Sequence, residues 1–194
     1  MSLLGKSGVG KTSFISKFIN NKLPDDYDPD FDNRFKISKT FGKKEYLMEI
    51  LDTKYDEENY RSIVDLWINF GEGFLLVFSI NDYESFEFLK DIYKIILRFK
   101  NYRNCPILLV GNKLDLKNER VVRYSEAKEL ADSWEIEYCE ISTRNDSDCQ
   151  KILEKIIKKY IIIQKENQPY KGNPWMCCLV LLYFGLCCCL CGRI

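Results

Sequence analysis

A glycine-rich stretch near the start of the chain holds the residue types most able to do chemistry. Gly5–Thr12 has the order Gly-Lys-Ser-Gly-Val-Gly-Lys-Thr, which is a glycine, four free positions and then Gly-Lys-Thr. The glycines let the backbone curl around a polyphosphate and point its N–H groups at the anion. Lys11 adds a positive charge against the outer phosphates, and Thr12 would place its hydroxyl on Mg²⁺. The alternative is a glycine-rich turn with a chance lysine, but the spacing favours a phosphate-binding loop.

The flanking segments must hold this loop in place. Leu3 and Leu4 are typical of the end of a strand, and the residues from Thr12 to Asn20 carry apolar side chains at helical spacing. The loop is therefore expected between a strand and a helix, whose N-terminus adds partial positive charge. The strand can use only Met1–Leu4 of this sequence, so we expect it to be short.

Three further polar motifs follow apolar runs and are expected at the carboxyl ends of strands, where α/β folds bind ligands. Asp52 ends the first run and can hold Mg²⁺ directly or through water, although an aspartate there is also a common helix cap. Asn112–Asp115 ends the second run. Asp115 can accept hydrogen bonds from N1 and N2 of guanine, a pattern that adenine does not offer, while Lys113 lies along the base. A plain turn is the alternative for this motif.

The last motif, Glu140–Arg144, offers a backbone N–H to the guanine O6. The other elements alternate between strand and helix patterns, which predicts an α/β fold with a parallel sheet covered by helices on both sides. We expect a hairpin formed by residues 34–40 and 45–51, which adds one antiparallel edge strand to the sheet. Further strands are expected at 74–78, 106–110 and 137–141. Helices are expected at 63–70, 85–99, 125–134 and 149–163. A polar loop is expected after Leu116.

Composition narrows the function class. The 194 residues allow one domain and a tail, and 29 basic residues balance 29 acidic ones, so no net charge draws the chain to nucleic acid. Cys105, Cys139 and Cys149 are scattered and are expected to be small buried hydrophobes. The other six cysteines crowd into the C-terminal segment, and no histidine is present, which argues against a disulfide framework and against metal–thiolate chemistry. Because the phosphate motif begins at residue 5, we expect no signal peptide and a cytosolic body.

Taken in order, these motifs resemble the Ras superfamily of small GTPases. The matching residues are Gly5–Thr12, Tyr27–Pro29, Asp52 and Thr53, Asn112–Asp115, Ser142–Arg144 and, for the Ras subfamily, Gly71–Phe74. The resemblance implies a P-loop fold of six strands and five helices, GTP and GDP as ligands, Mg²⁺ as cofactor and two loops that rearrange when the terminal phosphate is lost. It also implies exchange factors, activating proteins and effectors as partners of a monomer. Nucleotide contacts are expected from Gly5, Ser7, Gly8, Val9, Gly10, Lys11, Thr12, Ser13, Asn112, Lys113, Asp115, Ser142, Thr143 and Arg144.

The departures from the family pattern fall on the catalytic machinery. Asp30 stands where the family has a threonine that senses Mg²⁺ and the terminal phosphate, so the expected metal ligands are Thr12, Asp30 and Asp52. Asp52 and Thr53 are followed by Lys54–Glu57, without the family's glycine and water-positioning glutamine. Lys11 remains as a catalytic residue, with Asp56 or Glu57 to position water. We expect weak intrinsic hydrolysis, and the alternative is a pseudo-GTPase scaffold that binds nucleotide without turnover.

The C-terminal segment has a different character. We expect a GTPase domain at residues 1–165, a linker at 166–174 and a membrane-anchoring tail at 175–194. Trp175–Gly192 is an uncharged stretch of 18 residues, just long enough to span a bilayer core. A tail anchor, S-palmitoylation of its cysteines, or both would hold the protein at the cytoplasmic face of a membrane; a buried core helix is the alternative. Gly192 and Arg193 replace the aliphatic residues of a prenylation box, so prenylation is not expected.

Overall fold

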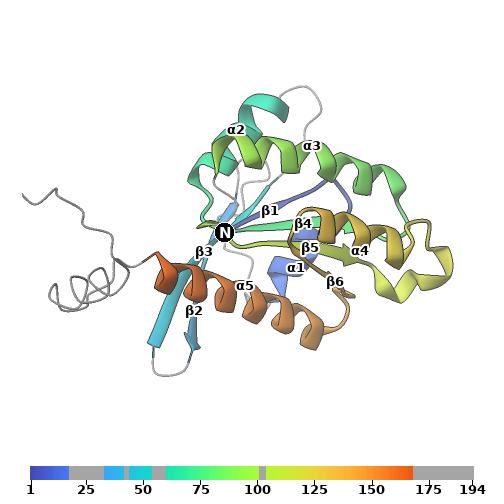
Figure 1. Cartoon of the computed structure of the whole chain (residues 1–194). Coiled ribbons are helices and arrows are strands. Elements are labelled where there is room, and N and C mark those ends of the chain that lie inside the picture. The colour runs from blue at the N-terminus through green and yellow to red at the C-terminus, as the bar shows by residue number, and fades with distance from the viewer. Residues whose placement is uncertain (18–32, 42–43, 54–59, 101–103, 168–194) are drawn as a thin grey trace, which may run out of the picture.

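The protein folds around a six-stranded sheet with helices on both faces (Figure 1). This computed structural model describes residues 1–17, 33–41, 44–53, 60–100 and 104–167. The strand order is β2-β3-β1-β4-β5-β6, and all neighbours are parallel except β2 and β3. The strands are β1 (Ser2–Leu4), β2 (Asn33–Phe41), β3 (Lys44–Asp52), β4 (Phe74–Ser79), β5 (Ile107–Asn112) and β6 (Glu137–Glu140). The predicted α/β fold with one antiparallel edge strand is confirmed.

The helices cover the two faces of the sheet unequally. Their bounds are α1 (Lys11–Ser16), α2 (Tyr60–Phe70), α3 (Tyr83–Phe99), α4 (Tyr124–Ser133) and α5 (Asp146–Glu166), with a 3-10 helix η2 (Leu114–Glu119). One core packs α2, α3 and α4 on one face of the sheet around Phe74, Phe78 and Phe86. The other core packs α1 and α5 on the opposite face. Strands β4 and β5 are buried along their whole length, as their continuous apolar runs predict.

Strand β1 is short but central. It comprises three buried residues and pairs in parallel with both β3 and β4. Its pairing with β3 is confined to Ser2 with Leu51 and Leu3 with Asp52, whereas β2 pairs with β3 from Lys44 to Asp52. The loop that follows β1 therefore begins at the carboxyl end of the sheet, next to the end of β3.

Two expectations need correction. The residues after Leu116, expected as a polar loop, begin within a 3-10 helix, because η2 occupies Leu114–Glu119; Arg120 follows it and is bound to Glu140. Cys105 and Cys149 are buried as expected, but Cys139 is half-buried. Its sulfur accepts a hydrogen bond from Lys155 at 3.2 Å, so this thiol is not a simple apolar core group.

Several predicted features lie outside the described residues. They are the polar loop from Asn21 to Phe31, the segment from Lys54 to Asn59 and the chain from residue 168 onward. Among the helices that the structure describes, none combines the length and the apolar character needed to cross a bilayer.

Candidate functional site

The glycine-rich loop connects β1 to α1 and encloses the amine of Lys11. The Lys11 amine donates to the backbone oxygens of Gly5 and Lys6, both at 2.8 Å, and the side chain is buried. Burial lowers the pKa of Lys11 to about 8, while the nearby carboxylate of Asp52 acts in the opposite direction. An anionic ligand at this loop would favour the charged form of the amine. The structure thus places Lys11 where the sequence predicts a phosphate-binding cation.

Gly10 must be a glycine for two reasons. Its φ of 99° lies in the left-handed region. A Cβ atom there would lie 2.3 Å from the side-chain nitrogen of Asn112. Gly8 shares the left-handed backbone, with φ of 77°, but a Cβ there meets nothing within 4 Å among the described residues.

These two glycines give a matched prediction. Gly10→Ala should lower the free energy of unfolding by about 2 to 4 kcal/mol, because the strained backbone adds to the displacement of the Asn112 amide. Gly8→Ala should lower the free energy of unfolding by only about 1 to 2 kcal/mol, because the left-handed backbone is strained but no side chain is displaced. Urea denaturation of the two variants measures the difference. Equal urea midpoints for the two variants would show that the Asn112 side chain can move away from the added methyl group without loss of stability.

The end of β3 brings together the two expected metal ligands that the structure describes. The Thr12 hydroxyl donates to the carboxylate of Asp52 at 2.6 Å. Asp52 is buried, and Lys11 lies close enough for its charge to interact with this carboxylate. A hydroxyl and a carboxylate are oxygen donors of the kind that Mg²⁺ prefers, so the residues present fit this ion. Asp30, Asp56 and Glu57 lie outside the described residues.

Asn112 joins three segments of the site. Its side-chain nitrogen donates to the backbone oxygen of Val9 at 2.8 Å. Its side-chain oxygen accepts from the backbone N–H of Thr143 at 3.1 Å. Because Asn112 is buried, these bonds hold the phosphate loop, β5 and the loop after β6 at fixed distances. The expected role of Asn112 as a base contact is thus accompanied by a structural role that its motif alone did not indicate.

The carboxylate of Asp115 is the centre of the predicted base site. The Ser142 hydroxyl donates to one of its oxygens at 2.6 Å, and Nε of Arg144 lies 3.3 Å from the other. The hydrogen bond from Ser142 is the largest cause that keeps the pKa of Asp115 below its ordinary value. Asp115 is therefore ionised and acceptor-only at neutral pH. Lys113 has the left-handed φ of 68°, which turns the chain from β5 into η2.

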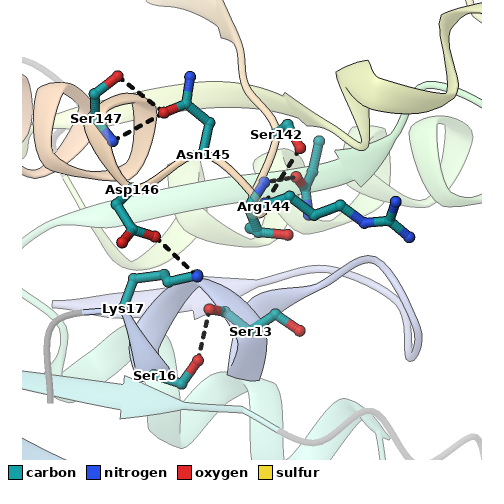
Figure 2. Close-up of polar contacts among 10 residues, drawn as sticks. Ser13, Ser16, Lys17, Ser142, Arg144, Asn145, Asp146 and Ser147 are labelled. Carbon is teal, nitrogen blue, oxygen red and sulfur yellow. Dashed lines mark hydrogen bonds and ion pairs between the residues drawn. The ribbon is translucent and has the colours of Figure 1, made fainter. Parts of the chain in front are cut away.

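The loop after β6 leads directly into α5, and its residues lie beside the end of α1 (Figure 2). Asn145 caps α5 by accepting from the backbone N–H of Ser147 at 3.1 Å. Lys17, at the end of α1, lies 2.8 Å from Asp146 in the first turn of α5. This exposed ion pair links the helix after the phosphate loop to the helix that follows the predicted base site. Sequence analysis missed it, because only the fold brings residues 17 and 146 together.

Sequence analysis also missed a contact between Arg120 and Glu140, which lies next to the predicted base site. Arg120, just after η2, makes a two-pronged ion pair with Glu140 at 2.7 and 2.8 Å. The Tyr138 hydroxyl also donates to Glu140, at 2.6 Å. Burial raises the pKa of Glu140, but the bonds from Arg120 and Tyr138 outweigh it and hold the pKa below its ordinary value. These contacts tie η2, and with it Asp115, to the end of β6.

Glu140→Gln should therefore destabilise the protein by about 2 to 3 kcal/mol at neutral pH, because it leaves the Arg120 guanidinium poorly matched. Because the folded pKa of Glu140 is lowered, its contribution is present above the unfolded pKa and is lost as pH falls through the folded value. Urea midpoints of wild type and variant should differ at neutral pH and converge in acid. Asp91→Asn breaks an exposed pair with Lys94 and should cost less than about 0.5 kcal/mol. A Glu140→Gln midpoint no lower than that of Asp91→Asn would contradict the account.

The arrangement defines a class of protein. A glycine-rich loop between β1 and α1, with polar clusters at the carboxyl ends of β3, β5 and β6, is the architecture of a P-loop nucleotide-binding protein. A sequence model of the Ras family matches residues 1–162. The chain therefore belongs to the Ras family. It is a small GTPase, a guanine-nucleotide-binding switch of a family that binds GTP and GDP, generally with Mg²⁺.

Proposed function

We propose that this protein is a membrane-associated Ras-family switch that binds GTP and GDP with Mg²⁺ and hydrolyses GTP slowly without a partner. One observation carries the nucleotide assignment: Asp115, held by Ser142, lies in η2 just after β5, at the same carboxyl end of the sheet as the loop that carries Lys11. Its ionised carboxylate supplies the two acceptors that guanine needs. Asn112 keeps the base site and the phosphate loop at a fixed separation.

The site residues that the structure describes each have a role in this proposal. The backbone N–H groups of Gly8–Ser13 bind the phosphates, and Lys11 neutralises their outer charge. Thr12 and Asp52 would hold Mg²⁺, which would neutralise charge on the phosphate oxygens. Thr143 and Arg144 lie over the edge of the base. When guanine binds Asp115, the exposed Arg144 side chain gives up its 3.3 Å contact with that carboxylate.

The slow hydrolysis is proposed from sequence. Residues Lys54–Glu57, which follow Asp52 and Thr53, include no neutral amide that could orient the attacking water. Asp56 or Glu57 would have to do so with a carboxylate, which is repelled by the terminal phosphate. The loss of a positioning group commonly costs about two to three decades in rate. An activating protein that supplies the missing group would restore turnover.

The same departures favour a second candidate from another class, a scaffold that holds guanine nucleotide and does not turn it over. Asp30 adds to the case, since it brings negative charge toward the terminal phosphate where the family has a threonine. Turnover distinguishes the two candidates. Hydrolysis above the blank, with or without an activating protein, supports the switch, while a bound GTP that stays intact supports the scaffold.

Two measurements on the full chain test the binding and the membrane parts of the proposal. Chain purified in mild detergent should carry guanine nucleotide and bind GTP far more tightly than ATP; equal dissociation constants would refute the base site. Reconstitution with liposomes should make the chain float with the lipid. We attribute this to the uncharged Trp175–Gly192 segment, aided by Lys165 and Lys171 at an anionic surface. A chain that stays in the soluble fraction would refute the membrane assignment.

A further inference from the structure

A groove lies at the end of the sheet opposite the nucleotide site. Its volume is about 450 Å³, and its walls come from the start of β1, from β3, from the second half of α2 and the turn between α2 and β4, and from α5. The apolar lining is concentrated in Leu47, Leu66, Trp67, Phe70, Ile156 and Tyr160. A site of this volume holds a few large side chains.

The rim of this groove exposes large apolar side chains. The exposed fractions are 76% for Leu47, 71% for Phe70 and 56% for Leu66. Three such side chains around one hollow are more than the isolated apolar residues of an ordinary surface. Leu47, Leu66 and Phe70 therefore give the groove an apolar rim, which is typical of a surface that binds another protein segment.

The chain itself carries a suitable occupant. Helix α5 forms one wall of the groove through Ile156 and Tyr160, and it ends at Glu166. From Tyr160 to Glu166 the helix advances about 9 Å. The following residues, 167–174, can span about 26 Å when extended. This linker is long enough to turn back and bring Trp175 to the groove.

The segment that follows the linker matches the groove in chemistry. Trp175–Leu182 contains no charge, and it offers an indole and several leucine side chains to an apolar hollow. We propose that Trp175–Leu182 docks in this groove of the same chain when no bilayer is present. The groove and the membrane then compete for the tail, so docking would maintain a form of the protein in which part of the tail is sheltered from water. The contact in solution does not depend on the proposed nucleotide chemistry.

A photo-crosslinking experiment on the full chain tests this proposal. A photoreactive phenylalanine analogue replaces Phe70, whose exposed ring can be changed without disturbing the core. Irradiation in buffer without lipid or detergent should give a monomeric product in which position 70 is joined to a peptide from residues 175–182. The same analogue at Phe99, exposed on α3, is the matched control and should not capture the tail.

A second variant separates docking from chance proximity. Leu66→Asp places a charge on the exposed rim and should reduce the tail crosslink about tenfold, because the burial of that leucine is lost. The same variant should leave liposome flotation at least as high as in wild type. Products formed only between two chains would overturn the proposal, as would capture of other peptides, an unchanged yield in Leu66→Asp, or a chain recovered only as aggregates. Failure of flotation alone would refute the membrane assignment and leave this result standing.

Discussion

Asp115→Asn should weaken GTP binding about 100-fold and allow xanthosine triphosphate to bind in its place. In the proposed base site the ionised carboxylate of Asp115 would accept from N1 and N2 of guanine, and each hydrogen bond to a charged group is worth roughly 1.5 to 3 kcal/mol. An amide keeps one acceptor but turns an N–H toward the guanine amino group. Xanthine carries an oxygen at that position, so the amide can donate to it. Competition against a fluorescent guanine nucleotide measures both affinities.

Asp132→Asn is the matched control for this exchange of carboxylate for amide. Asp132 is exposed on α4 and pairs with Lys128, outside the motifs of the site. Its substitution should change neither affinity. If Asp115→Asn bound GTP as tightly as wild type and gained nothing with the xanthine nucleotide, Asp115 would not be the residue that reads the base.

Lys11→Met should lower nucleotide affinity about 100- to 1,000-fold. A unit charge about 4 Å from a phosphate charge contributes about 4 kcal/mol at an effective dielectric constant near 20, and part of this offsets the burial of the amine. Methionine keeps the length of the side chain but loses the bonds to the backbone oxygens of Gly5 and Lys6. Lys128→Met, on the exposed face of α4, should leave affinity unchanged. The two variants can be compared by titration with a fluorescent guanine nucleotide, with circular dichroism to verify folding.

The lowered pKa of Lys11 gives this prediction a second, independent readout. With a pKa of about 8 in the nucleotide-free protein, part of the Lys11 population is neutral slightly above that pH. Bound phosphate raises this pKa, so nucleotide binding at about pH 8.5 should take up a fraction of one proton. Calorimetry in two buffers of different ionisation enthalpy detects the uptake. An identical uptake in Lys11→Met would assign the proton to another group.

The same shift sets the sign of a stability effect. Because the folded pKa of Lys11 lies below its unfolded value of 10.5, the unfolded chain binds more protons between the two values. The contribution of Lys11 to the stability of the nucleotide-free protein therefore increases as pH rises from about 8 toward the unfolded pKa.

Most of the fold follows from local patterns. The continuous apolar runs of β4 and β5 predict buried parallel strands, and the alternation on either side of residues 42 and 43 predicts the β2–β3 hairpin. The Gly5–Thr12 motif predicts both the loop and the elements that flank it. Helix bounds were predicted less well: α2 begins at Tyr60 and α5 at Asp146, each about three residues before the predicted start, because polar first turns carry no apolar periodicity.

The contacts that complete the site could not be predicted from local patterns. Arg120 and Glu140 are twenty residues apart and meet only because η2 brings the chain back to β6. The link between Asn112 and Val9 joins two motifs whose spacing along the chain says nothing of their contact. The sequence predicts a small buried hydrophobe at Cys139, and only the position of Lys155 on α5 reveals the hydrogen bond to its sulfur. None of these contacts could be predicted from local patterns, because each pairs polar groups that are distant in sequence and meet only in the folded chain.

Single-turnover hydrolysis tests the central claim most directly. The full chain in mild detergent is loaded with GTP, Mg²⁺ is added, and the conversion of bound GTP to GDP is followed beside a Ras-family protein that retains the water-positioning glutamine. The account predicts that GTP binds tightly and is converted about 100- to 1,000-fold more slowly than in that protein. Conversion at the same rate as in the glutamine-containing protein would contradict it.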